Sequence, residues 1–330
     1  MTAGDNRVFN RLMFGNDPVL QAAWLYYQSG LSQTEVADAM GISRVTVVKY
    51  LQIARESGVV NISLDMSRYS RIDMALSLKK QFDLTSVLVV PDNPAPEAAA
   101  DSARRRENMA QAAAVYLSQV IEDGDVLGVA WGRTIHHLAK CLMPKTVHNV
   151  TVLQMLGSVP SQPDFTTVES SSLIAGKFGG ECAYLHVPAI VSSAELADAL
   201  RREPIIRANF AQLDRCTKSL FVAGNVTEEN PLIRAGVITA EEMADFRRKG
   251  AVGVICGRFY DKDGTPLDTH TDARILGIRL PQLQQIARRI FIATGEQNVA
   301  ATRGALLGGY VSDLIVDPVI AANLLSGQSS

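Results

Sequence analysis

The chain has 330 residues, enough for about two domains at the usual size of roughly 150 residues each. Hydrophobic residues make up 47% of it and charged residues 20%, which excludes a wholly disordered, collagen-like or disulfide-dependent protein. The 32 Lys and Arg residues nearly balance 34 Asp and Glu residues, for a formal net charge of −2. This balance excludes a positive field over the whole molecule, so any binding to nucleic acid must use local charge.

Neither a secretion signal nor a membrane-spanning segment is predicted. The first 18 residues contain no apolar run behind basic residues, and no later run of about 18 residues lacks a charge or a helix breaker. We therefore expect a soluble, cytoplasmic protein that contacts no membrane. The cysteines form no C-x-x-C pair and are expected to be reduced and mostly buried; they are Cys141, Cys182, Cys216 and Cys256.

Three short helices are predicted after an arm at residues 1–18. Ser32 and Glu35 form a capping box at the start of the second helix, and Gly41 is suited to the turn that follows it. Ser43 is suited to cap the third helix. The predicted helices cover residues 19–29, 33–40 and 43–56, and the alternating stretch 59–64 predicts a strand.

The string LSQTEVADAMGISRVTVVKYL at residues 31–51 has the spacing of a helix-turn-helix, in which two helices cross at a short turn. The small, turn and apolar positions of that motif are occupied by Ala37, Gly41, Ile42, Val47 and Leu51. At 100° per residue, the third helix places Val47 and Leu51 on one face and turns another face outward. The residues predicted to contact DNA lie at its start and on that outer face: Ser43, Arg44, Val45, Thr46, Val48, Lys49 and Gln52. With the following strand, residues 19–64 are expected to form a winged helix-turn-helix domain.

Positive charge is concentrated on this third helix. Residues 41–55 contain Arg44, Lys49 and Arg55 and no acid. This local excess favours a helix that enters the major groove of operator DNA. The alternative is an ordinary helical hairpin with basic surface residues.

The rest of the chain is predicted to be an α/β domain. A linker helix is expected at residues 65–84, an effector and oligomerisation domain at 85–325, and a tail at 326–330. Runs that are apolar on both faces and alternate with helices indicate a mostly parallel sheet covered on both sides. The runs are residues 86–90, 126–130, 150–156, 182–187, 219–223, 252–256, 290–293 and 313–316. Residues 91–108 are expected to be a polar loop that leads into a helix.

Several separated motifs resemble the SorC family of bacterial sugar-responsive transcriptional regulators, in that family's order. They are GDVLGVAWGRTIHHLA (124–139), VLQMLGS (152–158), GAVGVICGRFYDKDG (250–264) and the stretch IFIATGEQNVAATRGALLGGYVSDLIVDPVIAANLL (290–325). The resemblance covers residues 19–325. It implies a helix-turn-helix followed by an effector domain with the fold of sugar-phosphate isomerases and deaminases, and it implies a homotetramer.

A small-molecule site is expected outside the carboxyl ends of the strands, where open α/β sheets bind ligands. Gly132 allows close backbone approach, and the N–H groups at a helix start, with Arg133 and Thr134, suit an anion or a polyol. The residues predicted to bind the effector are Gly132, Arg133, Thr134, Gln154, Gly157, Gly224, Asn225, Gly295 and Asn298.

The chain departs from the family pattern at three positions. The family usually has a small hydroxyl residue at Ile135, an acid at Val254 and a lysine near Asn298. Because two charged ligand contacts are missing, we expect an effector with little or no charge, such as a sugar alcohol or free sugar, in preference to a bisphosphate.

Other candidate features weigh less. His136 and His137 are neighbours on a helix and lack a spaced third ligand, so no metal site is predicted. Asp261 and Asp263 fit a hairpin turn better than a calcium loop. The run Arg104–Arg106 is expected to be a solvated helix face. No nucleotide-binding or serine-hydrolase motif occurs, and no cofactor or catalytic residue is predicted.

The favoured function is therefore an effector-controlled transcription factor that binds operator DNA as a homo-oligomer, a dimer or a tetramer. A sugar-phosphate isomerase or deaminase is the alternative, although the absent acid and lysine argue against it. A third possibility is an interaction adaptor without a ligand.

Overall fold

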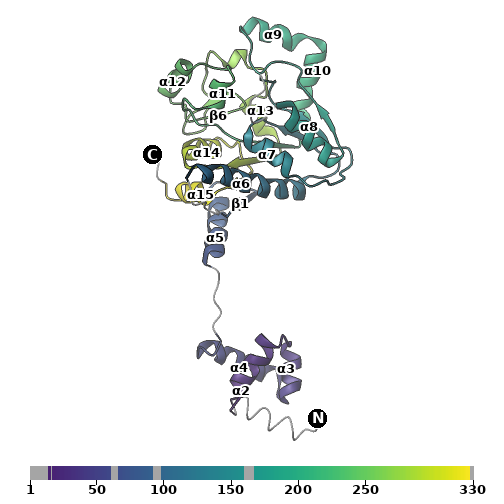
Figure 1. Cartoon of the computed structure of the whole chain (residues 1–330), viewed down its shortest axis with the longest axis vertical. Helices are drawn as coiled ribbons and strands as arrows, with labels where there is room; N and C mark the ends of the chain where they lie inside the picture. Colours follow the sequence, from purple (N-terminus) through teal and green to yellow (C-terminus); the bar gives the residue numbers. More distant parts are fainter. Residues whose placement is uncertain (1–13, 16, 61–65, 92–97, 160–166, 328–330) are drawn as a thin grey trace. The chain divides into compact units, whose positions relative to one another are not determined.

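The helices of the N-terminal part pack in the order expected for a helix-turn-helix. The computed structural model describes residues 14–15, 17–60, 66–91, 98–159 and 167–327, which fall into two compact units, residues 1–68 and 69–330. The first unit contains α2 (Pro18–Ala23), η1 (Trp24–Gln28), α3 (Gln33–Met40) and α4 (Arg44–Glu56) (Figure 1). Its core is formed by the buried side chains of Ala22, Val36, Ala37, Val47 and Leu51.

The predicted caps are confirmed. The Ser32 hydroxyl accepts the Glu35 N–H at 3.3 Å while the Glu35 carboxylate accepts the Ser32 N–H at 2.8 Å, and Gly41 ends α3 with φ of 68°. The Ser43 hydroxyl accepts the Thr46 N–H at the start of α4. The predicted arm and the strand at 59–64 lie largely outside the described residues.

The first helix differs from its prediction in its last turn. The Ser29 N–H donates to the Trp24 carbonyl at 3.1 Å, five residues back, so residues 24–28 form a π-helical turn. Such a turn holds one more residue than an α-helical turn. Gly30, with φ of 72°, then reverses the chain toward α3.

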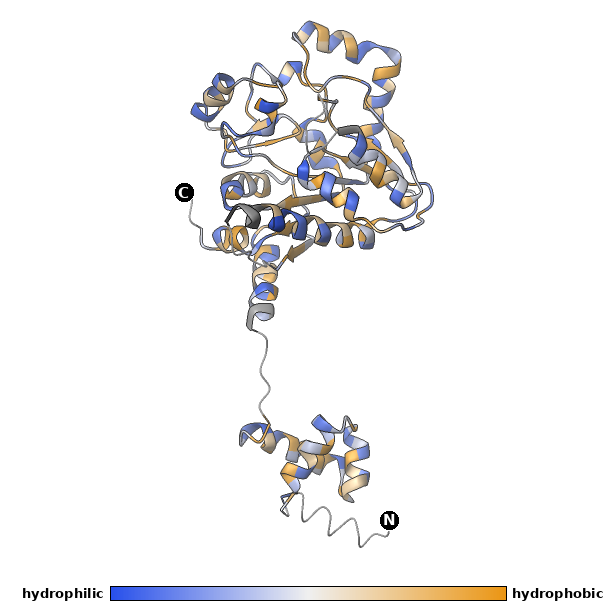
Figure 2. Cartoon of the chain, viewed as in Figure 1, coloured by the Kyte–Doolittle hydropathy of each residue, from blue (hydrophilic) through white to orange (hydrophobic). Residues whose placement is uncertain are grey.

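The second unit begins within α5 (Met66–Gln81) and contains a seven-stranded, fully parallel sheet. The strand order is β1-β9-β8-β5-β2-β3-β4. The strands are β1 (Ser86–Val89), β2 (Val126–Val129), β3 (Thr151–Gln154), β4 (Glu181–Ala183), β5 (Lys218–Phe221), β8 (Arg288–Ala293) and β9 (Asp313–Val316). The predicted α/β class is thus confirmed, and Figure 2 shows the hydrophobic strands enclosed by helices of mixed polarity.

Helices cover both faces of the sheet, and each face packs with its helices in a separate hydrophobic cluster. One cluster joins the sheet to α6 (Ala98–Val120), α7 (Arg133–Cys141) and α8 (Thr167–Phe178). The other joins it to α5 and to helices from the later chain, and contains Phe221, Phe291 and Leu314 from the strands. The later helical elements are α9 (Ala194–Arg202), α10 (Pro204–Gln212), η2 (Leu213–Arg215), α11 (Pro231–Arg234), α12 (Ala240–Arg248), η3 (Asp272–Arg274), α13 (Leu280–Gln285), η4 (Glu296–Asn298), α14 (Val299–Leu307) and α15 (Pro318–Leu325).

The prediction of a parallel strand at residues 252–256 was wrong. This run forms β6 (Gly253–Ile255), which pairs antiparallel with β7 (Arg258–Tyr260) outside the main sheet. Cys256 and Gly257 join the two strands with φ of 48° and 77°, as a two-residue hairpin turn requires. The run is apolar because it packs on two clusters: Val254 lies in a third cluster with α11 and α12, whereas Ile255 and Cys256 lie in the cluster of Phe221 and Phe291. An apolar run alone does not show which layer it joins.

Two other loop predictions have opposite outcomes. The expected hairpin turn after β7 is confirmed, because the Asp261 carboxylate accepts the N–H groups of Asp263 and Thr265 at 3.0 and 2.8 Å. The loop expected at 91–108 is wrong in its second half, since α6 begins at Ala98. Among the described ranges, no helix is both long and apolar enough to cross a membrane.

The order of the strands creates a switch point between β2 and β5. From β2 the chain moves outward through β3 and β4, and it then returns to the other side of β2 with β5, followed by β8 and β9. The connections that leave β2 and β5 therefore diverge at their carboxyl ends. Open sheets of this kind have a crevice at that position.

Candidate functional sites

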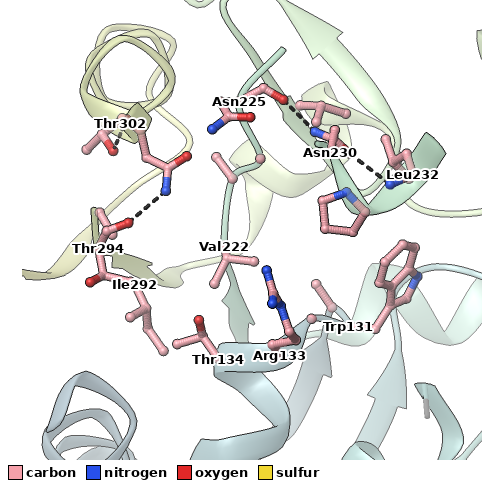
Figure 3. Close-up of a pocket in the computed structure, with 18 of the residues that line it drawn as sticks. Trp131, Arg133, Thr134, Val222, Asn225, Asn230, Leu232, Ile292, Thr294 and Thr302 are labelled. Carbon is pink, nitrogen blue, oxygen red and sulfur yellow. Dashed lines mark hydrogen bonds between the residues drawn. The ribbon is translucent and has the colours of Figure 1, made fainter. Parts of the chain in front are cut away.

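A cavity of about 450 Å³ lies at this switch point, outside the carboxyl ends of β2, β5 and β8 (Figure 3). This volume is within the range of small-molecule sites, about 300–1,000 Å³. The polar and charged residues in its lining are Arg106, Arg133, Thr134, Asn225, Thr227, Glu229, Asn230, Thr294, Gln297, Asn298 and Thr302. Apolar side chains such as Trp131, Val222 and Ile292 form the remaining wall.

The start of α7 forms one side of the cavity. Gly132 precedes this helix with φ of 153° and ψ of 160°, a conformation that is essentially restricted to glycine. The first N–H groups of a helix have no acceptor within it, and in the described structure no side chain caps those of α7. Figure 3 shows the Arg133 side chain extending from the helix start toward the middle of the pocket, between Thr134 and Trp131. Backbone donors, a guanidinium group and a hydroxyl therefore converge here.

The segment after β5 forms a second side. Asn230 is 2% exposed; its amide donates to the Asn225 carbonyl, and its side-chain oxygen accepts the Leu232 N–H at 2.8 Å. Gly224 exchanges two backbone hydrogen bonds with Val254, of 2.9 and 3.0 Å. The Gly224 backbone thus holds β6 against the cavity and is not left to bind a ligand.

The segment after β8 forms a third side. The Asn298 amide donates to the Thr294 carbonyl at 2.7 Å, and the Thr302 hydroxyl donates to the Asn298 carbonyl at 2.7 Å. The first bond holds the Asn298 side chain in one orientation at the edge of the pocket, and the second holds its backbone. Its remaining amide N–H and its side-chain oxygen are groups that suit sugar hydroxyls.

Three residues predicted to bind the effector do not line the cavity. Gln154 is buried at the end of β3, and its amide nitrogen lacks a hydrogen-bond partner among the described residues. Gly157 allows close packing instead, because a Cβ there would lie 2.5 Å from the Pro188 carbonyl oxygen. Gly295 donates its N–H to Asp317 at 2.7 Å and has φ of 88°, so it shapes the turn before η4. The other six predicted residues, Gly132, Arg133, Thr134, Gly224, Asn225 and Asn298, lie in the lining.

The departures from the family pattern do not all bear on the cavity. Val254 and Asn298 line it, whereas Ile135 is fully buried in the core between α7 and the sheet. The expectation that Arg104–Arg106 form a solvated face was also wrong in part. Arg104 is exposed, but Arg106 is partly buried and lines the cavity.

Two further positions in or near the site have altered proton affinity. Burial raises the pKa of the Cys256 thiol to about 12, so this lining residue remains a neutral thiol at physiological pH. Burial lowers the pKa of His136, whose Nδ1 lies 3.4 Å from the Ser170 hydroxyl. The expectation that the cysteines are mostly buried fails at Cys141, which is exposed at the end of α7.

The outer face of α4 is the candidate surface for DNA. Val47, Leu51 and Ala54 are buried, whereas Val45 and Val48 are 79% and 43% exposed. Arg44, Lys49 and Gln52 are exposed as predicted.

Hydrogen bonds within the unit hold several of the side chains predicted to contact DNA in place. Arg44 donates to Gln33 at 3.3 Å, and Gln52 donates to Glu56 at 2.8 Å. The hydroxyl oxygens of Ser43 and Thr46 lie 2.8 Å apart. Contacts to bases or phosphates therefore compete with these local bonds.

Both parts of the chain match known families. Residues 69–326 match the family described as "Putative sugar-binding domain", and residues 19–61 match the "Homeodomain-like domain". The chain is 59% identical to the "Uncharacterized transcriptional regulator YjhU" of Escherichia coli (strain K12), over 96% of this chain and 97% of that protein. It is 33% identical to the "Deoxyribonucleoside regulator" of Bacillus subtilis (strain 168), over 93% and 96% of the two chains. The chain belongs to the SorC family of sugar-binding transcriptional regulators.

A solved structure shares the fold of this SorC-family regulator. The crystal structure of the full-length Sorbitol Operon Regulator SorC from Klebsiella pneumoniae superposes with a TM-score of 0.72 at 24% identity, over 93% of this chain and 97% of that one. The relatives are named as transcriptional regulators. The SorC-family regulator is thus a DNA-binding protein with a sugar-binding domain and not an enzyme.

Proposed function

We propose that this SorC-family regulator binds operator DNA through the outer face of α4. We propose that it also binds a sugar-like metabolite in the cavity outside the carboxyl ends of β2, β5 and β8. The DNA-binding domain comprises residues 19–64. The linker helix comprises residues 65–84, and the effector and oligomerisation domain comprises residues 85–325. The regulated genes serve carbohydrate or polyol catabolism. Because its target is chromosomal DNA, the protein acts in the cytoplasm.

The observation that carries the DNA-binding proposal is the arrangement of α4. Its buried face is apolar, and its outer face presents Arg44, Lys49 and Gln52 beside the exposed methyl groups of Val45 and Val48. Arginine and lysine suit guanine edges, glutamine suits adenine, and valine methyl groups suit the methyl group of thymine. This mixture is appropriate for sequence reading rather than for phosphate attraction alone.

The cavity supports the effector proposal by its position and its chemistry. It lies at the switch point of a parallel sheet, where such folds bind ligands. Thr134, Asn225 and Asn298 place hydroxyl and amide groups in its lining, and these groups form hydrogen bonds with polyols. The apolar side chain of Trp131 can cover the C–H face of a sugar.

Control of transcription requires that the effector bind two arrangements of the protein with different affinity. We propose that these arrangements are different spacings of DNA-binding domains in a homo-oligomer, a dimer or a tetramer. Two domains of a dimer would contact half-sites about one helical turn of DNA, ~34 Å, apart. Analytical ultracentrifugation with and without operator DNA measures the oligomeric state, and a monomer on the operator would contradict the proposal.

The DNA-binding proposal is tested with Lys49→Ala. The probe is a duplex selected from a random library by the wild-type protein, and the measurement is fluorescence anisotropy at constant salt. Loss of a groove contact should weaken binding by about 1–3 kcal/mol per domain. Lys140→Ala, which removes the same charge from an exposed position at the end of α7, serves as the control and should leave affinity unchanged. Equal affinity of both variants would contradict the proposal.

A further inference from the structure

Arg106 reaches the cavity from α6, which follows β1 and not one of the three strands, β2, β5 and β8, whose ends border the cavity. It lies near the start of α6, and its side chain lines the cavity beside the residues of α7. One turn later on the same face are Met109 and Ala110, and two turns later is Ala113; all three are buried against α7 and the sheet. Helical spacing therefore directs Arg106 inward, in contrast to the exposed Arg104.

The far end of α6 fixes the position of Arg106 along the sheet. Tyr116 donates its hydroxyl to Asp313, at the first residue of β9, and Arg288, at the first residue of β8, donates to both Asp313 and Tyr116. These contacts lie at the amino edge of the sheet. Ten residues earlier, about 15 Å along the helix axis, Arg106 stands at the opposite edge, where the cavity opens.

Arg106 changes the charge balance of the cavity. Among the described lining residues, the charged side chains are Arg106, Arg133 and Glu229, two positive groups against one negative group. The start of α7 adds about half a positive charge. Guanidinium groups bind carboxylates and phosphates through paired hydrogen bonds. The expectation of an uncharged effector rested on the charges missing at Val254 and Asn298, and it did not include Arg106.

We infer that Arg106, together with Arg133, binds an anionic group of the effector and so determines that the cavity takes a charged rather than a neutral polyol. The effector class is a polyhydroxylated compound with a carboxylate or a phosphate. This inference rests on the proposed function, namely that a sugar-like metabolite binds in this cavity.

The test uses matched sets of probes and the full-length protein. Each set contains the alditol, the aldonate and the aldose phosphate of one stereochemistry, for the ribo, xylo, gluco and galacto series. Thermal shift identifies members that bind, and calorimetry measures their affinity. We expect stabilisation by an aldonate or an aldose phosphate and none by the corresponding alditol, and the two charged arms distinguish carboxylate from phosphate.

Variants at Arg106 then assign the selectivity to this residue. Arg106→Gln should weaken binding of the charged probe about 10- to 100-fold, the usual effect of losing a charged hydrogen bond, and Arg106→Lys should retain part of the affinity. Arg104→Gln, two residues away on the exposed face of the same helix, should change it less than twofold. A thermal transition of the effector unit that matches the wild type in the absence of ligand shows that each variant is folded.

The outcomes separate this inference from the proposed function. Binding by alditols alone, with a change in operator affinity, would leave the regulator as proposed and overturn the anion-binding role of Arg106. Equal affinities of Arg106→Gln and Arg104→Gln for a charged probe would overturn it as well. If no probe binds, the inference is overturned, and effector control of this cavity also loses its support.

Discussion

The two units of the molecule differ in how far apart in sequence their functional residues lie. The surface proposed to contact DNA comes from one helix, and the motif that positions it spans 21 residues, from Leu31 to Leu51. The cavity proposed to bind the effector is lined by residues from Arg106 to Thr302, carried on several helices, strands and loops. The first surface depends on local rules of capping and helical spacing, and the second depends on the order of strands in a sheet. Substitutions should therefore damage them independently.

The largest effect is expected in the small unit, from Val47→Asp. Val47 is fully buried in a core of few side chains, and a carboxylate without a partner there would cost several kcal/mol, on the order of 3–5. We expect loss of operator binding, while the thermal transition of the effector unit remains. Val45→Asp makes the same change at a position that is 79% exposed and should leave the helices folded by circular dichroism. Co-operative loss of both units in Val47→Asp would show that they are not independent.

A similar effect, confined to the other unit, is expected at Asp125. Its carboxylate is buried beside Lys218 at 2.5 Å and accepts the Thr217 hydroxyl at 2.6 Å. Burial acts to raise the pKa of Asp125, but the hydrogen bonds of Lys218 and Thr217 lower it on balance. Asp125→Ala leaves the Lys218 ammonium buried without this partner, at a cost of about 3–5 kcal/mol.

The pH dependence of stability checks the same pair. Because the folded pKa of Asp125 is below its unfolded value of about 3.9, its stabilising contribution is present above pH 4 and is lost as the pH falls through the folded pKa. Urea midpoints between pH 6 and pH 2 should therefore fall more steeply for the wild type than for Asp125→Asn. Asp198→Asn, at an exposed ion pair, serves as the control and should follow the wild type. Parallel curves for all three proteins would contradict the assignment.

A smaller effect is expected from Gly157→Ala. The sequence predicts that Gly157 binds the effector, whereas in the structure this glycine allows close packing against Pro188. The added Cβ would meet the Pro188 carbonyl oxygen at 2.5 Å, so we expect a loss of about 1–3 kcal/mol in unfolding free energy. Effector affinity of the folded fraction should not change. Gly176→Ala in α8, where an added Cβ has no neighbour within 4 Å, should be neutral or stabilising. Lower effector affinity without lower stability would restore Gly157 as a ligand contact.

Sequence reasoning predicted most of the fold because its signals are local. Ser32, Glu35 and Gly41 determine helix ends by hydrogen bonds within one turn, and apolar runs determine buried strands. It failed at residues 252–256, where an apolar run joins a hairpin and not the sheet. Which layer such a run enters depends on its packing partners, here α11 and α12 for Val254 and the cluster of Phe221 and Phe291 for Ile255, and the run itself does not specify them.

The candidate site was predictable only where a residue directly follows a strand. Gly132, Arg133 and Thr134 follow β2, and the order of the strands brings Asn225 and Asn298 beside them. Gln154 is the last residue of β3, but β3 lies on the far side of β2 from β5 and β8. Arg106 could not be found in this way, because it does not follow the end of a strand. The packing of α6 against α7 brings it to the cavity.

The most direct test of the account measures operator affinity with and without the effector found among the probes. The wild type is compared with Thr134→Val/Asn298→Leu, a double variant that removes two polar side chains from the cavity lining at nearly constant volume. We predict that the effector changes operator affinity at least tenfold for the wild type and not for the variant, while both bind the operator equally without effector. An equal response of the variant would show that the cavity outside the carboxyl ends of β2, β5 and β8 is not the site through which the effector controls operator binding.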